Sequence, residues 1–251
     1  MKVARVWWRR SPMMAALALA HLMLLIGLLA AVAMDDAQVL GINRWIKPAK
    51  FAASIALYLA TLAWYAPVLG DSTGKRRAFL LIAIGMLVEQ VVITIQSARG
   101  TTSHYNIGTM LDAALFQSMG IWIAINTVAA GYCGWLALRT FRGTGETHAL
   151  AVALGFAVFL AGSAIGAMMI GHNGHTMGAL DGGPGLPFVN WSTVAGDLRV
   201  SHFLGLHALQ LLPVIAVVAG RRALWGATVA WLLLTGLALA QAVSGRPFWA
   251  A

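Results

Sequence analysis

The sequence predicts an all-α membrane protein that folds as a seven-transmembrane-helix bundle, with residues 1–251 forming a single transmembrane domain. Of its 251 residues, 60% are hydrophobic and only 10% are charged, and the mean hydropathy is +0.78. Soluble domains are about 45–50% apolar and about 25% charged. So few polar residues cannot coat a core of this size, and the composition therefore excludes a water-soluble globular protein and a disordered chain.

Apolar runs long enough to cross the hydrocarbon core, about 20 residues each, give the seven helices. In chain order they cover residues 13–35, 49–70, 78–98, 109–138, 149–171, 200–220 and 223–244. The first run follows a basic start but exceeds the apolar stretch of a signal peptide, so we expect it to stay as a helix. The fourth run is longer than one crossing requires and is expected to tilt or to extend beyond the bilayer.

Lysine and arginine residues favour an N-terminus inside and a C-terminus outside, because cytoplasmic loops retain positive charge. With this orientation, 11 of the 17 basic residues lie inside and 6 lie outside. The net charge of +9 follows from the topology and requires no nucleic-acid partner. We expect a multi-pass protein of the bacterial inner membrane, whose partners are membrane lipids and a lipophilic or anionic small molecule.

The outer connections are longer than the inner ones. Residues 172–198 form a 27-residue stretch rich in Gly, Pro, Asn and His, long enough to fold over the outer mouth as a lid. Four of the seven histidines lie on the outer rim in this topology: His104, His172, His175 and His202.

Polar residues inside the helices lie at similar depths in the membrane. The depth below the outer rim is calculated from the number of residues to the outer end of the span, at about 1.5 Å per residue. Glu89 lies roughly 14 Å and His207 roughly 11 Å below the outer rim. Further polar side chains fall at similar depth or share a helix face with His207, namely Tyr58, Gln117, Ser163 and Gln210. This layer predicts a polar cavity that opens to the outside.

Glu89 is the most informative single residue, because it is the only carboxylate at the centre of a span. An unpaired charge there costs about 2.5–3.5 kcal/mol on insertion scales, so the group must be protonated, paired or wetted. One interpretation is a protonated clasp to Gln90 or Gln117. The other is a catalytic proton donor or acceptor that shares a site with His207.

The histidines are also candidate metal or haem ligands: His104, His172, His175, His202 and His207. Residues 168–177 combine three methionines with two histidines, a ligand set typical of copper, and His/Met is also a haem axial pair. The residues paired most plausibly are His104 with His202 and Glu89 with His207. The single cysteine, Cys133, excludes a disulfide framework and cysteine-based metal clusters. The alternatives are helix capping and ordinary core packing.

Basic residues near the outer mouth have two interpretations. Lys47 and Lys50 flank Pro48 before the second span, and Arg99 and Arg199 lie at other outer helix ends. Snorkelling cations beside a tryptophan anchor would explain them. Alternatively, they gather to attract an anionic substrate or haem propionates.

Three segments resemble motifs of a widespread bacterial family of small seven-span membrane proteins to which no activity is attached. They are Trp-Ile-Lys-Pro-Ala-Lys-Phe at 45–51, Arg-Gly-Thr-Thr-Ser-His-Tyr-Asn at 99–106 and His-Phe-Leu-Gly-Leu-His at 202–207. The resemblance implies the same membrane fold over most of the chain. It does not extend to microbial rhodopsins, because the last span lacks the Schiff-base lysine.

Three functions fit the sequence. The first is a haem b or copper protein that uses His207 or the rim histidines, with oxidoreduction of a lipophilic substrate as its activity. The second is cofactor-free acid catalysis on a lipid or isoprenoid substrate, with Glu89 as proton donor. The third is a carrier or sensor without catalysis.

Overall fold

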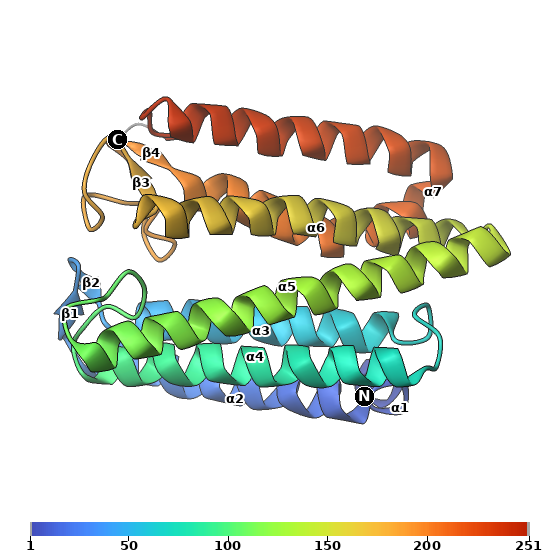
Figure 1. Cartoon of the computed structure of the whole chain (residues 1–251), viewed down its shortest axis with the longest axis horizontal. Coiled ribbons are helices and arrows are strands. Elements are labelled where there is room, and N and C mark those ends of the chain that lie inside the picture. Colours follow the sequence, from blue (N-terminus) through green and yellow to red (C-terminus); the bar gives the residue numbers. More distant parts are fainter. Residues whose placement is uncertain (1, 250–251) are drawn as a thin grey trace. The chain divides into compact units, whose positions relative to one another are not determined.

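The computed structural model describes residues 2–249 and, among them, the side chains of residues 6–249. The chain ends whose sidedness was predicted, Met1 and 250–251, lie outside the described residues, as do the side chains of Lys2 and Arg5. Contacts divide the chain into two compact units, Met1–Ala129 and Ala130–Ala251, with the boundary inside a helix (Figure 1).

The described residues form seven helices and two short two-stranded ladders. Six helices are long and apolar enough to cross a membrane. The prediction of an all-helical protein with several helices of membrane-spanning length is therefore confirmed.

The first unit contains helices α1 (Lys2–Arg10), α2 (Pro12–Met34), α3 (Ile46–Tyr65) and α4 (Thr73–Ala98), and the first part of α5 (Met110–Thr144). Ser11 is extended and Pro12 opens α2, as expected of a residue that is preset for a helix start. The Oγ of Ser72 caps α4 by accepting the backbone N–H of Lys75 at 3.1 Å.

A hairpin joins α2 to α3. Strands β1 (Gln38–Val39) and β2 (Ile42–Asn43) pair antiparallel through Leu40 and Gly41, both at positive φ, as a tight two-residue hairpin turn requires. At the base of this hairpin the carboxylate of Asp35 accepts bonds from Arg44 and from the indole Nε1 of Trp45, the latter at 2.7 Å. These bonds fix the point at which α3 begins.

The second unit contains the remainder of α5, α6 (Thr147–His172), strands β3 (Thr176–Met177) and β4 (Gly196–Asp197), and α7 (Leu198–Val243). The segment predicted as a lid is thus tied by the β3–β4 ladder and by a bridge between Gly185 and Ser192. Whether it covers a site stays a prediction.

Helix α7 is broken at Gly220, whose φ of 79° and ψ of −173° are accessible essentially only to glycine. Figure 1 shows the chain reversing its direction within α7, from orange to red. The indole of Trp231 on the second arm donates to the carbonyl of Leu204 on the first at 2.7 Å. The two arms cover the predicted runs 200–220 and 223–244 and fold back on one another.

Helix α6 packs closely against the first arm of α7 through two glycines. A Cβ on Gly205 would lie 2.5 Å from the Cα of Gly162, so the two backbones meet without side chains between them. Close approach through small residues is the usual way in which helices associate in lipid.

Candidate functional site

Glu89 of the first unit makes its contact with His104. The Nε2 of His104 lies 3.4 Å from the Oε1 of Glu89. The Glu89 residue is 3% exposed, whereas the His104 side chain is 23% exposed. The buried carboxyl group and the partly exposed imidazole therefore form one site.

The loop between α4 and α5 folds back to bring His104 to Glu89. Gly100 and Tyr105 have positive φ values of 71° and 57°, which reverse the chain. The side-chain amide of Asn106 donates to the Oγ1 of Thr101 and the carbonyl of Thr102, at 3.0 and 2.9 Å. The polar residues of the segment 99–106 therefore hold the loop in the shape that brings the imidazole of His104 to Glu89.

The other ring nitrogen of His104 faces Lys47. The Nζ of Lys47 lies 3.2 Å from Nδ1, and the Oγ of Ser103 lies 3.1 Å from the same atom. Because an ammonium group only donates, Nδ1 must accept, and the ring proton is then on Nε2, which faces Glu89. Lys47, His104 and Glu89 thus form a continuous polar chain.

Aromatic rings enclose this imidazole. The rings of Phe51, Tyr105 and Phe116 have centroids 5.8, 6.0 and 6.3 Å from that of His104. Burial and the adjacent Lys47 cation lower the pKa of His104 below its ordinary value, and Glu89 opposes this only in part. At neutral pH the imidazole is therefore uncharged.

The second carboxyl oxygen of Glu89, Oε2, is buried and has no hydrogen-bond partner within residues 6–249. On the next residue, the Nε2 of Gln90 donates to the carbonyl of Pro48 at 3.3 Å and to Thr94 at 3.1 Å. Gln90 therefore joins α4 to the start of α3 beside Lys47, and the proposed clasp between Glu89 and Gln90 is replaced by the contact with His104. The Oε2 atom is therefore the buried end of the polar chain, without a hydrogen-bond partner within residues 6–249.

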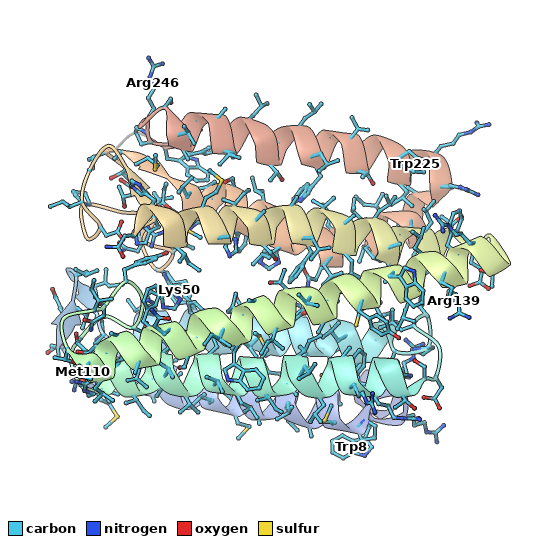
Figure 2. The ribbon with its side chains drawn as sticks, in the orientation of Figure 1. Trp8, Lys50, Met110, Arg139, Trp225 and Arg246 are labelled. Atoms are coloured by element: carbon cyan, nitrogen blue, oxygen red, sulfur yellow. The ribbon has the colours of Figure 1, made fainter. Side chains whose placement is uncertain are left out.

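Three of the four basic residues predicted to surround the outer mouth belong to the first unit, namely Lys47, Lys50 and Arg99. Arg99 pairs with Asp112 at 2.6 Å and also donates to the side chain of Gln96. Lys50 is half-buried one turn after Lys47 on α3, and Figure 2 shows it at the same end of the first unit as Met110. Arg99 thus has a carboxylate of its own.

The residues predicted to line a cavity in the first unit differ in exposure. Tyr58 is buried, and its hydroxyl donates to the Oδ1 of Asn126 at 3.5 Å. Gln117 is exposed. Tyr58 contributes to a buried polar contact, whereas Gln117 faces outward from α5.

In the second unit, His202 lies against α6. Its Nδ1 is 2.7 Å from the carbonyl of Gly162 and donates to it, which leaves Nε2 as the lone-pair nitrogen. Gly166 makes room for the ring, because a Cβ there would lie 3.0 Å from the Cε1 of His202.

His207 packs beneath Phe203, with ring centroids 4.1 Å apart, and its ring is hydrogen-bonded to Gln210. The two side chains therefore lie beside one another on α7. Ser163 donates to the carbonyl of Phe159 at 3.0 Å on its own helix. Each of the predicted pairs, Glu89 with His207 and His104 with His202, combines a residue of the first unit with a residue of the second. Both pairs therefore stay predictions.

His172, the last residue of α6, and His175, three residues further on, both contact the loop that follows the helix. The Nε2 of His172 lies 3.2 Å from the carbonyl of Thr176, and the Nδ1 of His175 lies 3.2 Å from Asp181. Nearby, Arg199 pairs with Asp197 at 2.6 Å. Among the described residues there is no group of three or more His, Cys, Asp or Glu side chains that could hold a metal ion.

Sequence reasoning identified Glu89, His104 and Lys47 but not their mutual contacts, and it did not identify Ser103. The signal available in the sequence was the polar run 96–106, whose Gly100 and Asn106 indicate a turn that folds back. Compared with protein-family models, curated proteins and solved structures, the chain matches none of them.

Proposed function

We propose that this is a seven-span protein of the bacterial inner membrane with its N-terminus inside and its C-terminus outside. As one straight helix, the 46 residues of α7 would be about 69 Å long, more than twice the roughly 30 Å of the hydrocarbon core. The reversal at Gly220 instead divides them into two arms, each of membrane-spanning length. Arg221 and Arg222 follow the break, as the excess of positive charge on the inner side favours.

The function that the geometry supports best is acid–base catalysis on a lipid or isoprenoid substrate, with Glu89 as proton donor. The observation that carries this proposal is the contact between Glu89 and His104, combined with the buried Oε2 atom that has no partner within residues 6–249. A carboxyl group held in this way keeps one oxygen for proton exchange with the imidazole and the other for the substrate. In the proposed topology, the site lies toward the outer side of the membrane.

Replacing Glu89 by glutamine tests the proposal. The amide keeps the size of the side chain but cannot transfer the proton, so turnover should fall about 100-fold or more. The protein is reconstituted with total bacterial lipid, and mass spectrometry follows which lipid class disappears with time. Glu146→Gln is the matched control, because Glu146 is exposed at the start of α6.

A lipid class that the wild type and Glu146→Gln convert and Glu89→Gln does not is the expected result. Conversion that persists in Glu89→Gln excludes Glu89 as the donor. Binding or flux of a lipid without conversion in the wild type would support a carrier or sensor instead.

A second candidate, haem b or copper binding in the second unit, is favoured by His202. Metal-bound imidazoles typically donate their other N–H to a carbonyl, as the Nδ1 of His202 does to Gly162. His202 would hold the metal, which would supply redox chemistry. His104 fits this role less well because both of its ring nitrogens contact protein groups. His172 fits it less well because its side chain is exposed, whereas His202 packs against α6.

The absorption spectrum and elemental analysis of the purified protein test this candidate. We expect a haem band or stoichiometric copper in the wild type that His202→Ala loses. His172→Ala, which changes the exposed histidine at the end of α6, should retain it. A wild-type protein without haem absorbance and without copper contradicts the candidate.

A further inference from the structure

Lys47, His104 and Glu89 are arranged in series across one imidazole ring. The Nζ of Lys47 is 3.2 Å from Nδ1, and Nε2 is 3.4 Å from the Oε1 of Glu89. Each ring nitrogen therefore has a different ionisable partner, and the imidazole contacts both Lys47 and Glu89.

We propose that Lys47 supplies the proton that restores Glu89 after each turnover, and that it also fixes the tautomer in which His104 passes the proton on. This inference rests on the proposed role of Glu89 as proton donor. It assigns to Lys47 a positioning role and a proton-supply role at the same site.

The proton transfer is balanced in atoms and charge. The Nζ of Lys47 gives a proton to Nδ1 of His104 while the Nε2 proton moves to the Oε1 of Glu89. The ammonium becomes an amine, the carboxylate becomes a carboxylic acid, and the imidazole changes only its tautomer. The net charge of the three groups is zero before and after, so the step adds no net charge to this poorly solvated region.

Exposure sets the direction of proton entry. Glu89 is 3% exposed, while Lys47 at the start of α3 is half-buried and the side chain of His104 is 23% exposed. Water can recharge the half-buried Lys47 amine, whereas the buried Glu89 carboxyl group contacts the more exposed imidazole.

Ser103 is the second group at Nδ1, with its Oγ at 3.1 Å. A hydroxyl both donates and accepts, so it tolerates either tautomer of the ring. The ammonium of Lys47 only donates. The preference for the Nε2–H tautomer is therefore set by Lys47.

Two substitutions of Lys47 separate its two roles. Lys47→Arg keeps a cationic donor that does not lose its proton, so it preserves the tautomer and removes the proton source. Lys47→Met removes both. Lys75→Met is the matched control, because Lys75 lies near the opposite end of the first unit and pairs with Asp71.

Two measurements on the full chain in lipid vesicles test the two roles of Lys47 separately. Nitrogen-15 NMR of labelled histidines gives the tautomer of His104, identified by the signal that His104→Gln loses. Infrared spectroscopy follows exchange of the Glu89 carboxyl proton after transfer into heavy water, identified by the band that Glu89→Gln loses.

In the wild type and in Lys75→Met we expect a protonated Nε2 and fast exchange. Lys47→Arg should retain this tautomer while exchange slows at least ten-fold. Lys47→Met should lose the tautomer preference and also slow exchange. A wild-type His104 protonated at Nδ1, or exchange at the wild-type rate in both Lys47 variants, overturns the inference.

These outcomes are distinct from failure of the proposed function. If Glu89→Gln abolishes lipid conversion while the Lys47 variants exchange like the wild type, Glu89 remains the donor and only the Lys47 route is excluded. If Glu89→Gln converts lipid normally, the catalytic role is lost, and the NMR result still decides whether Lys47 fixes the tautomer.

Discussion

Replacing Gly205 by alanine is expected to lower the free energy of unfolding by about 3 kcal/mol, the upper range for overpacking a tight contact. The new Cβ would lie 2.5 Å from the Cα and 2.9 Å from the N of Gly162, and both are backbone atoms. Because neither can move as a side chain would, α6 and the first arm of α7 must separate. The midpoint of unfolding in a detergent titration measures the loss.

The control uses two other glycines of the same helix. A Cβ on Gly226 or Gly236 would meet nothing within 4 Å. Alanine there should leave stability unchanged or raise it by up to about 1 kcal/mol, since alanine has the higher helix propensity. A Gly205→Ala protein as stable as these controls would show that the two helices do not depend on the close contact.

Replacing Asp197 by asparagine is expected to cost about 3 kcal/mol, the lower end for breaking a buried ion pair. The Oδ2 of Asp197 accepts the backbone N–H of Ser192 at 2.8 Å and a guanidinium N–H of Arg199 at 2.6 Å. Its Oδ1 accepts the backbone N–H and the Nε–H of Arg199 at 3.0 and 2.9 Å. An asparagine has only one acceptor oxygen, so its amide N–H group would face one of these donors. The start of α7 and the end of the long loop would lose their shared anchor.

The same change should alter the response to acid. Burial raises the pKa of Asp197, but the bonds from Arg199 and Ser192 outweigh it, and the pKa lies below its ordinary value of 3.8. The stabilisation is therefore present above that value and is lost as the pH falls through the lower, folded pKa.

Unfolding midpoints measured at neutral pH, and again at about pH 4 and below, give the loss of stability and its dependence on acid. Asp197→Asn should be less stable at neutral pH and should show a smaller further loss in acid than the wild type. Asp36→Asn is the control, because Asp36 is exposed after α2. An Asp197→Asn protein with wild-type stability at neutral pH contradicts the anchoring role.

The helices could be predicted because membrane spans are marked by length and composition alone. The predicted runs 13–35, 78–98 and 149–171 agree with α2, α4 and α6 to within a few residues. The run 49–70 was too long at its end. Helix α3 stops at Tyr65 because Pro67 lacks the N–H that would continue the ladder.

The partner of Glu89 could not be predicted, because it depends on a chain reversal. Depth calculated along a helix placed His104 at the rim, well above Glu89. The left-handed conformation of Tyr105 and the bonds of Asn106 fold the loop back by enough to bring the two side chains into contact. The ladder between Thr176 and Asp197 was missed for a related reason, since its strands are two residues long and distant in sequence.

The reversal at Gly220 has a consequence for biosynthesis. Two apolar arms follow one another with almost no polar chain between them. In the proposed topology, the first arm cannot settle in the bilayer long before the second leaves the ribosome. The insertion machinery would therefore receive both as one helical hairpin, with the paired arginines retained on the side where translation occurs.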